Sequence, residues 1–325
     1  MTSVVIHGWA PSAIVGLVFC DLHMHSTASD GTTAPEQLAQ EARMLGLGAI
    51  ALTDHDTTDG LSRCAAVCAD VGIAFVPGIE VSADPALEAA PGQDGADPQR
   101  LGTLHILGLF VRHDDPMLAK IHTLMCAARN SRTPAIVAKL KQLGVRIEEA
   151  DVLAIARQQG TQVIGRPHIA QVLIRKGYVK SVQDAFSQYI GQGKPAYVRR
   201  DRLPAAEAID AIHHAGGLAI LAHPIQLGLR ALSELEHFVA RLKLLGLDGI
   251  ETRHSDHQPQ QRRQYCGLAS QFELLTSGGS DYHGSAKSVL MGSQQVPMAV
   301  YERLREASEP AGGRPGRGPR RPQSA

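Results

Sequence analysis

The stretch Cys20-Asp21-Leu22-His23-Met24-His25-Ser26-Thr27-Ala28-Ser29-Asp30-Gly31 follows an apolar run, residues 13–19, that predicts a short buried strand. His23 and His25 are two residues apart, and residues at that spacing in a strand point to the same face. Both imidazoles therefore leave the strand end toward one point in space, which is how a protein holds a metal ion. Gly31 permits a turn, so the carboxylate of Asp30 can come back toward the same place.

The length and composition of the chain predict a large α/β domain, alone or with an insertion. The chain has 325 residues, of which 44% are hydrophobic and 20% charged, the balance of a globular protein with a sizeable core. Lys plus Arg number 32, and so do Asp plus Glu. Because there is no basic excess of the kind that marks a dedicated nucleic-acid binder, any contact with nucleic acid should be local.

The cysteines and the N-terminal segment indicate a cytoplasmic protein. Five cysteines form no CxxC pair and no metal-finger spacing, which favours free thiols in a reducing compartment. Residues 4–19 are mildly apolar but contain Gly8, Pro11 and Gly16, with no Lys or Arg ahead of them. They suit neither a signal peptide nor a membrane span. We expect no membrane association and no obligate protein partner.

The pattern of apolar residues alternates between strands and helices, which is typical of a parallel sheet covered by helices. Thr33 and Glu36 have the spacing of a capping box before the first helix. With the strand at 13–19 there are about seven expected strands, and the others lie at 49–53, 74–81, 104–111, 218–222, 249–252 and 274–277. The expected helices between them lie at 35–45, 61–71, 205–215, 233–245 and 259–272.

Two segments interrupt this alternation. Residues 84–100 are rich in Pro and Gly and predict a polar surface loop. From 116 to 203 the pattern predicts four helices, at 117–143, 148–158, 168–176 and 182–190, and one strand at 196–198. We interpret 116–203 as a helical insertion over the end of the sheet.

Polar residues of the types that bind metals end one expected strand after another. In parallel α/β folds these carboxyl ends lie on one face, so the residues should converge: His23, His25, Asp54, His55, Glu80, His223, Glu251, Asp281 and His283. Imidazole and carboxylate without thiolate suit Mn²⁺, Zn²⁺ or Fe²⁺. The set exceeds the needs of one ion. Two or three metals with a bridging carboxylate would use it, and such clusters hydrolyse phosphate esters with a metal-bound hydroxide.

Several of these motifs together resemble the PHP (polymerase and histidinol phosphatase) superfamily. The resemblance runs in order from residue 17 to residue 304 and rests on Asp21-Leu22-His23-Met24-His25-Ser26 with Asp30-Gly31, Thr53-Asp54-His55-Asp56, Gly78-Ile79-Glu80-Val81-Ser82, Ala222-His223-Pro224 and Gly279-Ser280-Asp281-Tyr282-His283-Gly284. It is strongest with bacterial metal-dependent phosphoesterases that carry a helical insertion. These include nucleoside 3',5'-bisphosphate phosphatases and a 5'-to-3' exoribonuclease.

The resemblance implies a distorted seven-stranded (β/α)7, TIM-like barrel with a trinuclear metal site. The parts would be an N-terminal extension (1–14), the first part of the barrel (15–115), the helical insertion as a substrate cap (116–203), the second part of the barrel (204–308) and a disordered tail rich in Arg, Pro and Gly (309–325). Two or three divalent ions are implied. Mn²⁺ is the first choice, and Zn²⁺, Fe²⁺ or Mg²⁺ are alternatives.

The resemblance also implies which residues hold each ion. The first set is His23, His25, Glu80 and Asp281; Glu80 would bridge to a second ion held by His105 and His223; the third set is Asp30, His55 and His283. The pattern of polar residues at strand ends does not include His105, because it lies near the start of its expected strand. Thr252-Arg253-His254 departs from the small or apolar residues expected after Glu251.

Substrate contacts are expected from the insertion. Gly165-Arg166-Pro167-His168 and Gly193-Lys194-Pro195-Ala196-Tyr197 resemble phosphate-binding segments, and His257 is expected to line the pocket. Arg is suited to bidentate phosphate binding and Lys to a point charge. The leaving oxygen would be protonated by His168 or His223, or through a metal-bound water.

These observations predict an enzyme, a phosphoric ester hydrolase that removes the 3'-phosphate of nucleoside 3',5'-bisphosphates. The alternative is a 5'-3' exoribonuclease on short RNA. A histidinol phosphatase is less favoured, because the helical insertion resembles the nucleotide-acting group. A catalytically silent structural module would be expected to lose ligands, whereas all nine matched positions carry side chains that can bind metal.

Overall fold

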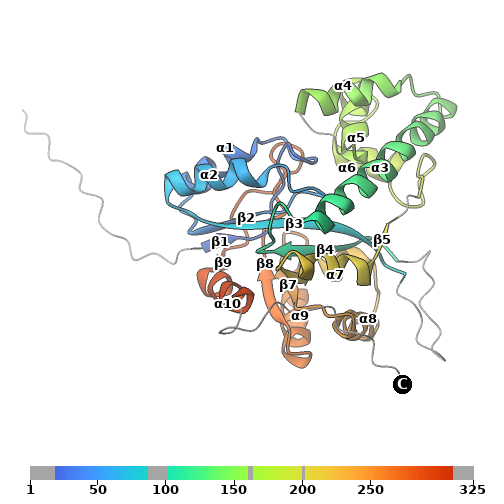
Figure 1. Cartoon of the computed structure of the whole chain (residues 1–325). Coiled ribbons are helices and arrows are strands. Elements are labelled where there is room, and N and C mark those ends of the chain that lie inside the picture. Colours follow the sequence, from blue (N-terminus) through green and yellow to red (C-terminus); the bar gives the residue numbers. More distant parts are fainter. Residues whose placement is uncertain (1–18, 87–100, 160–163, 200–201, 310–325) are drawn as a thin grey trace, which may run out of the picture.

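The computed structural model describes residues 19–86, 101–159, 164–199 and 202–309, and these contain a nine-stranded sheet (Figure 1). Its order is β8-β7-β6-β4-β3-β2-β1-β9, with β5 paired to β3. The strands are β1 (Phe19–Asp21), β2 (Ala49–Leu52), β3 (Ala74–Asp84), β4 (Leu104–Leu109), β5 (Leu203–Pro204), β6 (Leu218–Leu221), β7 (Gly249–Arg253), β8 (Leu275–Gly278) and β9 (Val296–Pro297). Without the two-residue strands β5 and β9, seven strands remain among the described residues.

The sheet curls into a nearly closed barrel, which confirms the expected fold class. Beyond the end of β1, the amide of Leu22 donates to the carbonyl of Gly278 (3.1 Å) and the amide of His25 to that of Tyr282 (2.9 Å). These bonds join the end of β8 and the chain after it to the chain after β1. The distortion is at β4, which runs antiparallel to both of its neighbours, β3 and β6.

Side chains alternate between the two faces of the barrel wall, as a strand period of two requires. In β2, Ile50 and Leu52 belong to the hydrophobic cluster shared with the surrounding helices, whereas Ala49 and Ala51 belong to a separate cluster with β4 and β6 residues. The helices that follow the wall strands are α1 (Pro35–Met44), α2 (Leu61–Val71), α7 (Ala205–His214), α8 (Leu232–Leu244), α9 (Pro259–Gln271) and α10 (Met298–Ser308).

A second group of helices stands apart from the barrel helices, at the upper right of Figure 1. It consists of α3 (Pro116–Gln142), α4 (Glu149–Gln159), α5 (Arg166–Arg175), α6 (Val182–Ala185) and the π-helical turn η1 (Phe186–Ile190). The long α3 belongs to both parts: Leu118 and Ile121 pack in the barrel cluster, and Ile136 and Leu140 pack in the cluster of the helical group. The helical group therefore has its own core and is tied to the barrel through α3.

Two expectations about local structure are wrong. The strand at 196–198 does not form, because Ala196 is buried in the helical core, where its amide donates to the carbonyl of Tyr189 and not to a neighbouring strand. The capping box is also absent: Ala34 is the N-cap of α1 and makes no side-chain hydrogen bond. The expected extension (1–14), most of the strand at 13–19, most of the loop at 84–100 and most of the tail lie outside the described residues.

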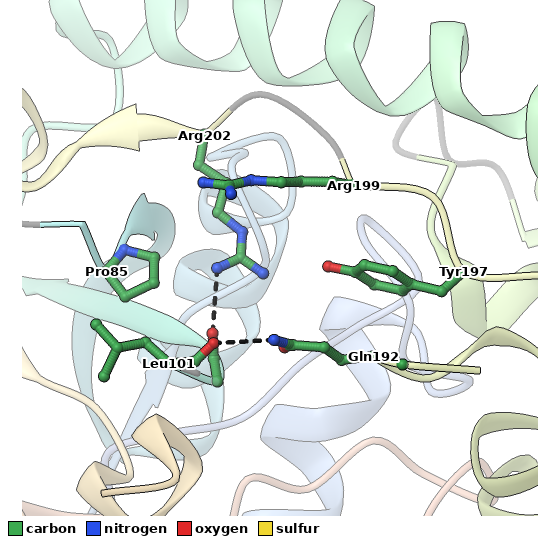
Figure 2. A pocket seen from close by; sticks show the side chains of 8 residues that line it. Pro85, Leu101, Gln192, Tyr197, Arg199 and Arg202 are labelled. Carbon is green, nitrogen blue, oxygen red and sulfur yellow. Dashed lines mark hydrogen bonds between the residues drawn. The ribbon is translucent and has the colours of Figure 1, made fainter. Parts of the chain in front are cut away.

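A cavity of about 330 Å³ lies where the helical group returns to the barrel (Figure 2). It is lined by Pro85, Leu101, Gly102, Gln192, Gly193, Tyr197, Arg199 and Arg202. No helix within the described ranges is long and apolar enough to cross a membrane.

Candidate metal centre

The nine expected ligands lie together at one end of the barrel. They come from the loop after β1, the chain after β2, strands β3 and β4, and the chain after β6 and β8. Each of them belongs to at least one group of three or four side chains whose ligand atoms lie within 4.8 Å of one another. Seven of the nine side chains are almost fully buried, and His55 and His105 are 13% exposed. The fold thus brings together residues spread over 261 positions, from His23 to His283.

His105 reaches this end of the barrel because β4 is antiparallel to its neighbours. It is the second residue of β4 and pairs with Ser82 of β3. In a reversed strand the beginning, and not the end, lies beside the carboxyl ends of the other strands. Reasoning from parallel strands alone therefore could not place it.

Four ligand atoms of the first expected set converge. His23 Nε2 lies 3.5 Å from both Glu80 Oε2 and Asp281 Oδ1. His25 Nε2 lies 3.2 Å from Glu80 Oε2 and 3.3 Å from Asp281 Oδ1. A metal bound at about 2.1 Å keeps neighbouring ligand atoms roughly 3.0 to 3.4 Å apart, so these separations suit one ion.

The other carboxylate oxygen of Glu80 faces the second expected set. Glu80 Oε1 lies 2.7 Å from His105 Nδ1 and 2.8 Å from His223 Nε2, and these two nitrogens are 3.3 Å apart. The two oxygens of one carboxylate thus point to two different sets of nitrogens. This is the arrangement that a bridging carboxylate requires.

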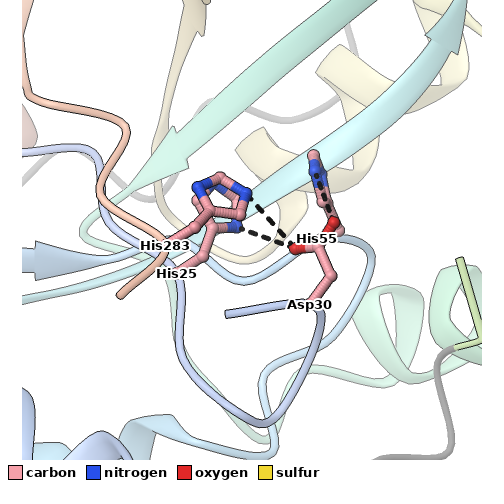
Figure 3. Close-up of side chains that lie close together, drawn as sticks. All are labelled: His25, Asp30, His55 and His283. Carbon is pink, nitrogen blue, oxygen red and sulfur yellow. Dashed lines mark ion pairs between the residues drawn. The ribbon is translucent and has the colours of Figure 1, made fainter. Parts of the chain in front are cut away.

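The third expected set lies around Asp30 (Figure 3). Asp30 Oδ1 lies 3.3 Å from His283 Nε2, and Asp30 Oδ2 lies 3.8 Å from His55 Nε2. His25 also approaches this group, with its Nδ1 3.9 Å from Asp30 Oδ1. The set is more open than the first two, and His25 stands between it and the first set.

Several ligand atoms are buried without a hydrogen bond. Among the described residues these include His23 Nε2, both ring nitrogens of His25, His55 Nδ1 and Glu80 Oε2. A buried polar atom without a partner carries a substantial free-energy cost, so clusters of them call for an explanation. Because these atoms face one another at ligand spacing, divalent cations fit the residues present.

The protonation of Glu80 and two of the histidines suits a cation. Burial by itself would raise the pKa of Glu80, but its interactions with the rings of His105 and His55 outweigh burial and hold that pKa well below its usual range. Burial lowers the pKa of His105 to about 3 and that of His283 to about 4. An ionised carboxylate with neutral imidazoles is the state that binds metal.

The pKa of His25 shifts in the opposite direction, upward. Its burial favours a neutral ring, yet its contacts with Asp281 and Glu80 raise its pKa to about 9. The carboxylates around it therefore demand a positive charge, which a proton or a metal ion can supply. Metal binding at His25 must release that proton.

Glu251, in the middle of β7, supports two of the expected ligands and is not itself one of the nine. Its Oε1 lies 3.1 Å from His23 Nδ1, and its Oε2 accepts a hydrogen bond from the amide of His223 (2.7 Å). Because the carboxylate is an acceptor, His23 carries its proton on Nδ1 and presents Nε2 to the first set. Metal-binding histidines usually have such a carboxylate partner on the other ring nitrogen.

His254 and Lys287 hold the outer oxygen of Asp281, and sequence reasoning assigned neither of them a role. His254 Nε2 lies 3.3 Å from Asp281 Oδ2, and Lys287 Nζ lies 2.5 Å from the same oxygen. The amide of Asp256 donates to His254 Nδ1, so the ring proton belongs on Nε2, facing Asp281. A His three residues after Glu251 was the available signal, but it read as a departure from the family pattern.

Asp54 shapes the loop that carries Asp30. It accepts hydrogen bonds from the amide and hydroxyl of Ser26 (2.8 and 2.6 Å) and from the hydroxyl of Ser29 (2.5 Å). The spacing of the Thr53-Asp54-His55 motif therefore combines a loop-fixing carboxylate with a ligand-type imidazole.

The expected substrate contacts differ in where they lie. His168 is fully buried, and its Nδ1 accepts a hydrogen bond from the amide of Gly165 (2.9 Å). Burial lowers the pKa of His168, and the carboxylate of Asp30 opposes that effect only in part. Arg166 is held inside the helical group, where it donates to the carbonyl of Ile190 and lies 5.0 Å from the ring of Phe186.

Lys194 and His257 lie in two further environments. Lys194 is exposed. His257 is buried beside His254 and donates from Nδ1 to the carbonyl of Thr252 (3.2 Å). Burial lowers the pKa of His257 to about 4, so its ring is neutral near pH 7. Of the four expected contacts, His168 has the clearest link to the metal centre.

Comparison with known proteins gives consistent matches. The model of the PHP domain matches residues 21–189. The 5'-3' exoribonuclease Rnm of Escherichia coli is 33% identical over 279 residues, which cover 85% of this chain and 88% of that protein. The 3',5'-nucleoside bisphosphate phosphatase of Chromobacterium violaceum is 31% identical over 269 residues, covering 81% and 86%.

A solved structure agrees with these matches. An amidohydrolase from Chromobacterium violaceum, crystallised with bound sulfate and no metal, superposes with a TM-score of 0.76 at 29% identity and covers 90% of this chain and 97% of that one.

Proposed function

The chain belongs to the PHP family and is a metal-dependent phosphoesterase, and we propose that it removes the 3'-phosphate from nucleoside 3',5'-bisphosphates. The observation that carries this proposal is the arrangement around Glu80, whose two oxygens face two separate sets of ligand-type nitrogens. The relative from Chromobacterium violaceum that bears this activity in its name supports the choice of substrate.

We propose the nine expected residues as ligands of two or three divalent ions, with Mn²⁺ as the first choice. Bound here, such ions would withdraw charge from phosphoryl oxygens and lower the pKa of water. Glu251 and His254 would keep His23 and Asp281 in place. The cytoplasm remains the predicted location.

His168 is our choice for the group that contacts the scissile phosphate. Its Nδ1 accepts a hydrogen bond, so in the neutral ring the proton is on Nε2, and within the described residues that atom is buried with no hydrogen-bond partner. A donor in that state can bind a phosphoryl oxygen or protonate the leaving oxygen. His223 is less suited, because its Nε2 is occupied by Glu80. Arg166, Lys194 and His257 remain proposed substrate contacts.

The second candidate is a 5'-3' exoribonuclease on short RNA. Two relatives of this chain, from Haemophilus influenzae and Escherichia coli, bear that activity in their names. The cavity with Arg199 and Arg202 favours it, because a substrate longer than one nucleotide needs cationic contacts away from the reacting phosphate. The same metal centre suits a phosphomonoester and a phosphodiester.

The test is a substrate comparison with the purified, Mn²⁺-supplied protein. Phosphate release is measured from a nucleoside 3',5'-bisphosphate and from a 5'-monophosphate, and product length is followed on a 5'-phosphorylated oligoribonucleotide. We expect turnover of the bisphosphate and loss of at least a hundredfold in kcat for Glu80→Gln, since positioning of the metals is worth several kcal/mol. The proposal fails if no nucleotide is turned over.

A further inference from the structure

The described residues that line the cavity between the helical group and the barrel include two arginines and no acidic residue. Arg199 and Arg202 both line it. The Arg199 side chain is 58% exposed, and its Nη2 lies 3.5 Å from Asp84 Oδ2. Among the described residues, one carboxylate therefore offsets one of two guanidinium groups, and a further anion is favoured in the cavity.

The walls of the cavity are fixed by bonds between the two parts of the molecule. Arg202 Nη1 donates to the carbonyl of Gly102 (3.3 Å), and Gln192 Nε2 donates to the carbonyl of Leu101 (3.0 Å). Figure 2 shows both bonds on one side of the cavity. Arg202 is thus oriented before any ligand binds, which reduces the entropy lost on binding.

Tyr197 provides a polar and aromatic wall. Its ring lies 5.5 Å from the guanidinium carbon of Arg166, and its hydroxyl points into the cavity toward the Arg202 side (Figure 2). A phenol hydroxyl next to two guanidinium groups can donate a third hydrogen bond to an anion. Bidentate guanidinium groups match phosphate geometry in particular.

Only a few residues of β3 and β4 and of the chain beside them separate the cavity from the metal centre. Gly102 precedes His105 by three residues, and Pro85 follows Glu80 by five. At about 3.3 Å per residue these separations are at most roughly 10 and 17 Å. An anion in the cavity therefore lies within the span of a single substrate molecule whose reacting phosphate is at the metals.

We propose that this cavity binds a second phosphate of the substrate, one that is not hydrolysed, through Arg199, Arg202 and Tyr197. The inference rests on the proposed function. The second phosphate is either the 5'-phosphate of a nucleoside bisphosphate or the next phosphate of an oligonucleotide. Both sources share the same chemistry, and the substrates below separate them.

The experiment compares Arg199→Ala with wild type on three substrates in the Mn²⁺-supplied enzyme. They are a nucleoside 3',5'-bisphosphate, a nucleoside 3'-monophosphate and a trinucleotide with a free 5'-hydroxyl, whose two phosphates are both internucleotide phosphates. Loss of one charged hydrogen bond should raise KM about tenfold for substrates whose second phosphate reaches the cavity, with kcat nearly unchanged. The 3'-monophosphate should change less than twofold. Arg199→Lys should recover part of the loss, and Arg263→Ala, an equal charge change on the exposed face of α9, should have no effect.

The pattern of KM values identifies the source of the phosphate. A rise for the bisphosphate alone assigns the cavity to a 5'-phosphate, and a rise for the trinucleotide alone assigns it to an internucleotide phosphate. Equal KM values in variant and wild type on all three substrates overturn the proposal. A rise in KM for the 3'-monophosphate as large as the rise for the substrates with two phosphates also overturns it. Either result leaves the proposed function intact, because that function depends on turnover by the wild-type protein.

Discussion

The buried carboxylate of Glu80 contacts two groups of imidazoles. Its Oε2 lies 2.8 Å from His55 Nδ1 and 3.2 Å from His25 Nε2, and its Oε1 faces His105 and His223. If the four imidazole rings were all protonated, the single negative charge of Glu80 could not balance their positive charges. If the rings are neutral, nitrogen lone pairs face the carboxylate oxygens without a proton between them. Metal ions on both sides of Glu80 satisfy the lone pairs and the carboxylate together.

Replacing His254 tests whether the residues behind the ligands matter. His254→Phe keeps a ring of similar size and removes the Nε2–H that faces Asp281 Oδ2. We expect metal affinity to fall by about 10- to 100-fold with the number of bound ions unchanged, as for other partners of metal ligands. Calorimetric titration of the metal-free protein with Mn²⁺ measures both quantities.

The control for this variant is His237→Phe, which alters an exposed histidine of α8. A drop of one whole equivalent of metal in His254→Phe would instead make His254 a ligand, since it forms a candidate group with His23 and Glu251. Unaltered metal affinity with a raised KM would assign it to the substrate.

Among the elements, α3 joins the helical group to the barrel. Arg129, in the middle of this helix, is only 6% exposed and donates from Nε (3.1 Å) and Nη2 (2.6 Å) to Asp56 Oδ2. Asp56 in turn accepts from the amide of Ser82 at Oδ1 (2.7 Å). A buried ion pair thus fixes α3 to the chain beside His55 and Glu80.

Breaking this ion pair should destabilise the protein strongly. Arg129→Met leaves the carboxylate of Asp56 buried without its cation, so we expect the free energy of unfolding in urea to fall by about 3 to 5 kcal/mol. Adding Asp56→Asn should cost less than the sum of the single changes, because the charge left behind is removed. Lys120→Met, on the exposed face of the same helix, should change stability by less than about 0.5 kcal/mol. Additive effects of the two changes would contradict the coupling.

The elements also show what the sequence could and could not predict. The extent of α2 is as expected, residues 61–71. Its apolar spacing indicates a helix, and Gly72, which has a left-handed backbone conformation, ends it. His105 could be assigned only through the family resemblance, since nothing local indicates that β4 runs antiparallel. The role of His254 depends on a contact with Asp281, twenty-seven positions away, and no local pattern encodes that contact. The expected strand at 196–198 failed because strand formation needs a free partner edge, which is a property of the whole fold.

For the whole molecule, the metal centre is a cross-link between strands. The expected ligands follow or belong to β1, β2, β3, β4, β6 and β8, six of the seven longer strands of the described barrel. The seventh, β7, supplies Glu251 and His254 behind them. Because ions bound there contact the folded barrel and not the unfolded chain, metal binding and barrel stability must be linked.

Removal of metal should therefore lower the melting temperature as well as abolish activity. Free Mn²⁺ at a hundred times its Kd stabilises a folded protein by about 2.7 kcal/mol per site, and for a chain of this size that corresponds to a shift of about 5 °C or more. The measurement is thermal unfolding after chelator treatment and again after Mn²⁺ is restored, with the Glu80→Gln variant beside wild type. The variant should lose most of the metal-dependent shift, because both sets that share Glu80 are weakened. A wild-type protein that melts at the same temperature with and without Mn²⁺, while still binding at least two equivalents, would show that the cluster does not cross-link the strands.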